Sequence, residues 1–151
     1  MAEGIRAAAD LLRNLARELL TKKGAMRPPE SILVVSSDAT TLQGLTRALM
    51  QSGWPVLSAF GWHEAESRLQ RIPVSLLVTD MEELSREDLS RVRQLRSGFP
   101  NVAIIALVSL ATPEARAAET EGLVLSVLEK PIALAHLEES VKLALARTAS
   151  P

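Results

Sequence analysis

Short apolar runs alternate with longer amphipathic segments along most of this chain. Five runs have the length and composition of buried strands: Ile32–Val35, Pro55–Ala59, Ile72–Val78, Val102–Val108 and Leu123–Leu128. Near-continuous apolar runs of this kind are typical of strands that are covered on both faces of a parallel sheet.

Between these runs, and after the last of them, apolar residues recur at helical spacing. The predicted helices cover approximately Leu42–Met50, His63–Leu69, Arg86–Ser97, Thr112–Thr120 and Leu134–Ala146. In the last helix we expect four buried residues: Leu134, Leu137, Val141 and Leu145. Strands that alternate with helices predict an α/β fold with a doubly wound parallel sheet. We expect the flavodoxin-like strand order 2-1-3-4-5.

The N-terminal stretch Ala2–Lys23 has a separate amphipathic helical pattern. Its apolar face includes Ile5, Leu12 and Leu19, and an Arg-Pro-Pro motif follows the helix. We therefore divide the chain into a helix (1–24), a linker (25–30) and a domain (31–148). The helix has three alternative roles: packing on its own domain, docking or dimerising with a partner, and lying on a membrane surface.

Composition excludes several classes of function. The 151 residues carry a formal net charge of −1 and are 47% hydrophobic, which fits a globular domain but gives no electrostatic case for nucleic acid. No stretch approaches the ~18 apolar residues of a membrane span, and the N-terminus lacks the apolar core of a signal peptide. The absence of cysteine excludes disulfides and favours a cytoplasmic location.

A compact set of residues, polar in only some of its members, marks the carboxyl ends of four predicted strands. These positions are Ser36 and Ser37, then Asp80, then Val108 with Ser109, and finally Lys130. Because the predicted order brings these strand ends to one edge of the sheet, we expect a constellation around Asp80.

Over residues 31–147 the chain resembles the receiver domain of two-component response regulators, the CheY-like family. The resemblance rests on Ile32–Val35, on Leu76–Asp80 and on Leu128–Pro131, at suitable spacings. It implies that Asp80 corresponds to the phospho-acceptor and Lys130 to the phosphate-binding lysine, with a cis bond before Pro131. In the family, Mg²⁺ held by two acids after the first strand assists formation of an acyl phosphate.

This chain departs from the family pattern at several positions. Ser36 and Ser37 occupy the two acidic positions, Val108 (with Ser109 beside it) the hydroxyl position, and Val127 the aromatic switch position. Neutral serines do not replace two carboxylates as ligands of a dication. We therefore expect no metal site.

Lys130 still requires an anionic partner. Our hypothesis is that its ammonium pairs directly with Asp80, while Ser36 or Ser37 donates a hydrogen bond to the same carboxylate. We predict a divergent receiver, or pseudo-receiver, that acts as a protein interaction module without Mg²⁺-dependent phosphorylation. The alternative is a response regulator that a histidine kinase phosphorylates on Asp80, with Mg²⁺ as cofactor.

An enzyme or cofactor-binding protein is the least supported class. The sequence contains no paired nucleophile and base and no glycine-rich phosphate loop, and His63 and His136 are isolated from other metal ligands. We expect other signalling proteins as partners. Homodimerisation through the N-terminal helix, or through the face of the helix at 112–120, the fifth strand and the last helix, is a further candidate. Contact residues proposed on that face are Glu114, Arg116, Glu119, Glu121, His136 and Glu139.

Overall fold

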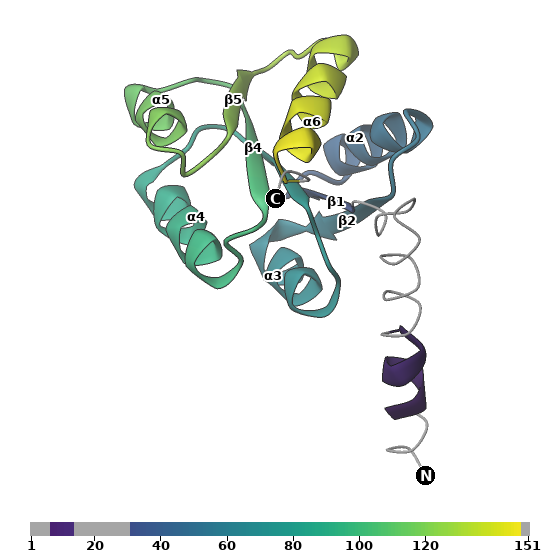
Figure 1. Ribbon diagram of the computed structural model, residues 1–151. Helices are drawn as coiled ribbons and strands as arrows, with labels where there is room; N and C mark the ends of the chain where they lie inside the picture. Colours follow the sequence, from purple (N-terminus) through teal and green to yellow (C-terminus); the bar gives the residue numbers. More distant parts are fainter. Residues whose placement is uncertain (1–6, 14–30, 149–151) are drawn as a thin grey trace.

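The computed structural model describes residues 7–13 and 31–148. Residues 31–148 form a five-stranded parallel sheet of order β2-β1-β3-β4-β5 with helices on both faces (Figure 1). This confirms the predicted doubly wound fold and strand order. The elements are β1 (Ile32–Ser36), α2 (Ala39–Gln51), β2 (Val56–Phe60), α3 (Gly61–Arg71), β3 (Leu76–Met81), α4 (Arg86–Gly98), β4 (Ala103–Val108), α5 (Pro113–Thr120), β5 (Ser126–Glu129) and α6 (Leu134–Thr148).

Residues 7–13 are helical, as predicted for this part of the N-terminal segment. The rest of the predicted helix 1–24 and the linker 25–30 lie outside the described residues. Of the helices that the structure describes, none is long and apolar enough to cross a membrane.

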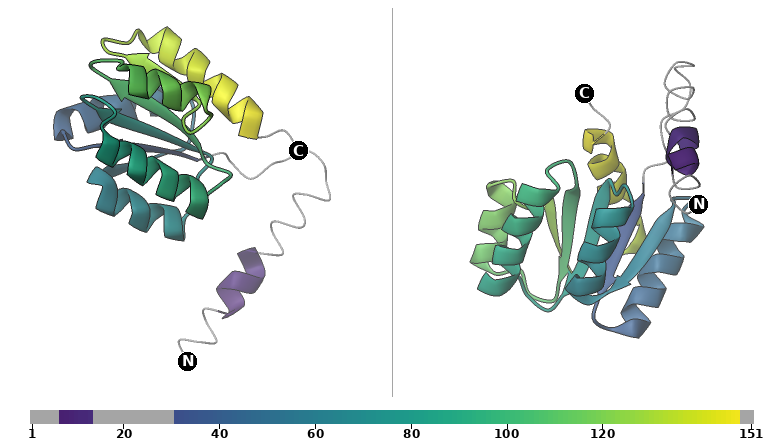
Figure 2. Two further views of the ribbon diagram at one scale, coloured as in Figure 1. Left: turned by 90° about the vertical axis from the view of Figure 1, so that its left-hand side faces the viewer. Right: turned by 90° about the horizontal axis from the view of Figure 1, so that it is seen from below.

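The sheet lies between two layers of helices (Figure 2). Two hydrophobic clusters of buried side chains fill the space between the sheet and these layers. Successive strand residues point to opposite faces, so Leu33 and Leu77 join the cluster beneath α3, α4 and α5. Ile32 and Leu76 join the cluster beneath α2 and α6. Burial on both faces explains why the strands read as continuous apolar runs.

Two strands begin three or four residues later than predicted. The third was predicted to begin at Ile72, but Ile72 ends α3 and β3 begins at Leu76, which pairs with Ile32. Asp80 therefore lies within β3 rather than beyond it. The fifth was predicted to begin at Leu123, whose N–H instead bonds to the carbonyl of Ala118 in the turn after α5.

One apolar side chain that was predicted to be buried is exposed, and a second exposed apolar side chain lies near the end of α2. Leu134, predicted to be buried, is 45% exposed because it is the first residue of α6, whereas Leu137 and Val141 lie in the core. Met50, near the end of α2, is 56% exposed, whereas its neighbour Leu49 is fully buried.

Candidate functional site

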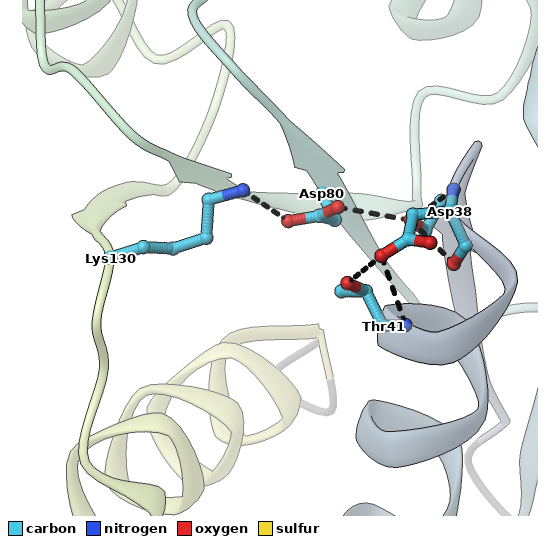
Figure 3. Close-up of polar contacts among 5 residues, drawn as sticks. Asp38, Thr41, Asp80 and Lys130 are labelled. Carbon is cyan, nitrogen blue, oxygen red and sulfur yellow. Dashed lines mark hydrogen bonds and ion pairs between the residues drawn. The ribbon is translucent and has the colours of Figure 1, made fainter.

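Asp80 and Lys130 form an ion pair at the carboxyl edge of the sheet (Figure 3). The Lys130 ammonium lies 2.6 Å from Oδ1 of Asp80, and the two side chains are 28% and 10% exposed, respectively. The lysine follows β5 directly, and its backbone N–H bonds to the carbonyl of Val108 at 2.7 Å. The predicted ion pair is therefore present, as a charge-assisted hydrogen bond. The predicted cis bond before Pro131 is also present.

Ser36 binds the other oxygen of the same carboxylate. Its hydroxyl donates to Oδ2 of Asp80 at 3.0 Å and accepts from the backbone N–H of Asp38 at 3.0 Å. Ser36 is 1% exposed, so this contact lies inside the domain. Ser37 is exposed and lines the adjacent cavity. Of the two serines proposed, Ser36 is thus the one that binds Asp80.

The next acid in the chain, Asp38, is engaged as a helix cap. Its carboxylate accepts hydrogen bonds from the hydroxyl and backbone N–H of Thr41, as expected for the N-cap of α2 (Figure 3). The bond from the Thr41 hydroxyl is the largest cause of a pKa below the ordinary value for Asp38. This acid is therefore charged at neutral pH and is committed to the start of α2.

Backbone hydrogen bonds fix the loop that follows β4. The carbonyl of Glu82, two residues after Asp80, accepts the N–H groups of Ser109 at 2.8 Å and Leu110 at 3.2 Å. Val108 lies in the hydrophobic core, so its side chain does not face Asp80. Ser109 is exposed beside it. The loop after β3 and the loop after β4 are thus joined through one carbonyl oxygen.

A cavity of about 420 Å³ opens beside this edge of the sheet. Its lining includes Ser36, Ser37, Trp62, Asp80 and Glu82. Mg²⁺ requires several hard oxygen ligands, preferably carboxylates. Here the central carboxylate is already bound by Lys130 and Ser36, and the carbonyl of Glu82 already accepts two N–H groups. Across the described ranges, no three acidic, histidine or cysteine side chains are grouped to hold a metal ion. The cavity lining also includes the acidic residues Glu82, Glu83 and Asp88. Of these, Asp88 already accepts hydrogen bonds from Ser85 at the start of α4. Holding Mg²⁺ here would therefore require these acids to rearrange around Asp80.

The residue at the switch position, Val127, is held by α5. The Glu119 carboxylate accepts the Val127 N–H at 2.6 Å, and Arg116 donates to the Val127 carbonyl at 3.3 Å. Arg116 and Glu119 also bond to each other at 3.4 Å. These two members of the proposed contact surface therefore bind their own domain.

The other proposed contact residues lie at the surface. The four exposed members are Glu114, Glu121, His136 and Glu139. His63 is likewise exposed on α3. Sequence reasoning missed the role of Arg116 and Glu119 in binding β5. The available signal was their opposite charges three residues apart on a helix next to an edge strand.

The chain resembles known response regulators in sequence. It is 23% identical over 117 residues to the transcriptional regulatory protein ZraR of Salmonella typhimurium, and this match covers 78% of the chain. The matched region is 26% of the length of that relative, so the comparison concerns one part of a larger protein. No model of a known protein family matches the sequence.

Solved structures of receiver domains have the same architecture. The receiver domain of an HD domain-containing protein from Pseudomonas fluorescens matches with a TM-score of 0.73 at 23% identity, over 82% of this chain and 100% of that one. A CheY-like receiver domain from Methanospirillum hungatei matches with a TM-score of 0.71 at 19% identity, over 80% and 97% of the two chains. These likenesses confirm the resemblance predicted from the sequence: residues 31–148 have the CheY-like fold of response regulator receiver domains.

Proposed function

We propose that this chain is a divergent receiver, a pseudo-receiver, that binds other proteins of a bacterial signalling system without Mg²⁺-dependent phosphorylation. The observation that carries the proposal is the state of Asp80. One oxygen of its carboxylate is bound by Lys130 and the other by Ser36. The proposal assigns the chain no catalytic activity of its own and places it in the cytoplasm.

The pocket chemistry supports this reading. Phosphoryl transfer depends on a cation that neutralises the charge of the phosphoryl oxygens. In this chain the two positions after the start of the sheet that would supply acids are the neutral residues Ser36 and Ser37, and Ser36 binds Asp80. The next acid, Asp38, already caps α2. Attack by one oxygen of Asp80 would also have to compete with the partner that already binds that oxygen.

The state of the output side also supports the proposal. Val127, at the position of the family's aromatic switch, is 3% exposed, and both its backbone groups are bound by α5. A small, fully packed side chain offers no second rotamer position comparable to that of a large aromatic ring. The face formed by α5, β5 and α6 is then a constant surface, whose exposed charges include Glu114, Glu121 and Glu139.

The alternative is a functioning phospho-acceptor. The retained Asp80 and Lys130, together with the similarity to ZraR, favour it. In that case a kinase would transfer a phosphoryl group to Asp80, and the Lys130 ammonium would then contact the phosphoryl oxygens instead of the carboxylate.

Binding of partners separates the two functions. We expect the wild type and Asp80→Asn, which keeps a neutral oxygen for Lys130, to retain the same partner proteins in equal amounts in an affinity capture. Glu114→Arg with Glu121→Arg, a charge reversal on the proposed face, should reduce capture. Equal capture by the charge-reversal variant, or loss of partners in Asp80→Asn alone, would contradict the proposal.

A further inference from the structure

An apolar groove is lined by residues of α2 and by Ser58 of β2. The strand β2 is the edge strand opposite β5, and α2 lies beside it (Figure 1). Its volume is about 600 Å³. Leu42, Thr46 and Met50 line it at intervals of one helical turn, so they form a continuous row along α2. Met50 is 56% exposed.

Two polar groups near this row are already bound within the domain. The Thr46 hydroxyl donates to the carbonyl of Leu42 at 2.7 Å, and the carbonyl of Ser58 accepts a 2.9 Å hydrogen bond from Arg68. Among the side chains that line the groove, Arg47 carries the single charge. The groove therefore offers a ligand mainly apolar contact.

The same chain contains a second apolar surface that lacks cover. Within helical residues 7–13, Leu11 is 60% exposed and Leu12 is 67% exposed. Ala7 lies one turn before Leu11, and Ala8 lies one turn before Leu12. The segment therefore presents two neighbouring pairs of apolar residues on its surface. A short amphipathic helix is marginal in water unless its apolar face is packed against a partner.

The chain reaches the domain close to this groove. The N–H of Ile32, at the start of β1, bonds to the carbonyl of Pro55 at 3.0 Å. Pro55 follows the end of α2 by four residues, and Met50 lies in the last turn of that helix. Residues 14–30 join the N-terminal segment to β1, and 17 residues can span at most roughly 60 Å. Because both surfaces belong to one chain, their docking is intramolecular, which raises their effective concentration.

We propose that residues 7–13 dock in the groove of their own domain, with Leu11 and Leu12 packed against the row of Leu42, Thr46 and Met50. Helices pack by placing the ridges of one into the grooves of the other, and rows of residues four apart form such ridges. Asp10, which pairs with Arg13 at 3.9 Å, adjoins the leucines, and Arg47 adjoins the row. This inference goes beyond the proposed function and does not depend on the state of Asp80.

The absence of native cysteine permits a direct crosslinking test on the full chain. We would combine Ala8→Cys with Gln43→Cys beside the groove and treat the protein with a short bismaleimide. The matched control combines Ala8→Cys with Gln94→Cys, an exposed position on α4 on the opposite face of the sheet. We expect intramolecular crosslinking at least roughly tenfold faster in the groove pair than in the control, as the effective concentration of a docked segment requires.

A second variant separates docking from a general effect of the tether. Adding Met50→Asp to the protein with Ala8→Cys and Gln43→Cys should reduce the crosslinking rate to that of the control. The melting temperature should not fall, because Met50 is exposed. Equal rates for the two cysteine pairs would overturn the proposal. So would crosslinked dimers as the main product, since they would assign the groove to the helix of a second copy.

Discussion

The Glu119 carboxylate accepts a 2.6 Å hydrogen bond from the backbone N–H of Val127, which joins α5 to the edge strand β5. Arg116 binds the carbonyl of the same residue. The opposite edge has the same arrangement, because Glu64 of α3 accepts the Phe60 N–H of β2 at 2.9 Å. Unpaired edge groups otherwise attract strands of other chains. Both edges of this sheet are thus partly closed by acidic and basic side chains.

Removal of the Glu119 carboxylate should destabilise the domain. We expect Glu119→Ala to lower the free energy of unfolding by about 1–2 kcal/mol, because the N–H of Val127 would lose its acceptor at a buried residue. Urea denaturation measures the change. The control is Glu121→Ala at the exposed end of the same helix, where a change within about 0.5 kcal/mol is expected. An equal loss of unfolding free energy in the two variants would show that the hydrogen bond to Val127 does not stabilise the domain.

The ion pair between Asp80 and Lys130 should also be measurable in stability. Breaking a fully buried pair costs roughly 3–5 kcal/mol. Because the Lys130 side chain is 28% exposed and can reach water, we expect about 1–3 kcal/mol for Asp80→Ala. In the double variant Asp80→Ala with Lys130→Met, most of this loss should be recovered, since no unpaired charge is left.

A double-mutant cycle by thermal or urea denaturation isolates this coupling. Strictly additive losses, or an Asp80→Ala variant as stable as the wild type, would argue against a structural role for the pair. Ser36→Ala provides a milder comparison, because it removes one hydrogen bond to Asp80 and leaves the ion pair in place.

Asp38 should make the start of α2 sensitive to acid. Its folded-state pKa is lowered chiefly by the hydrogen bond from the Thr41 hydroxyl. A depressed pKa stabilises the folded state above the unfolded pKa, and this contribution is lost as the pH falls from about 4 through the folded value. Melting temperatures of the wild type and Asp38→Asn should therefore converge below this range. Asparagine is a suitable control because it also caps helices but carries no charge. A constant difference between the two at all pH values would contradict the account.

The sheet was predictable because its strands have a local sequence pattern, and the central pair followed from the strand order and from the resemblance to receiver domains. Apolar runs fixed by burial on both faces gave the five strands, and parallel pairing then brought the ends of β3 and β5 together near Asp80. The carboxylate and the ammonium, placed side by side in a partly buried site, have few arrangements other than a direct contact.

Other features depend on contacts that have no local pattern. The start of β5 was predicted too early because the N–H of Leu123 is taken by the carbonyl of Ala118, a turn that apolar periodicity does not reveal. The binding of Val127 by Glu119 was missed because charged residues on a short helix usually face solvent. The role of the Glu82 carbonyl has no sequence signal, because every residue carries a carbonyl group and only the fold determines its partners.

The central claim is that Asp80 is a structural acid rather than a Mg²⁺-dependent phospho-acceptor. Its most direct test is the intact mass of the full chain after incubation with acetyl phosphate, with and without Mg²⁺. Ser36→Asp with Ser37→Asp, which supplies two carboxylates beside Asp80, serves as the comparison. We expect no phosphoryl adduct on the wild type under either condition and a Mg²⁺-dependent adduct only in the double variant. A Mg²⁺-dependent adduct on the wild type that Asp80→Asn abolishes would contradict the account.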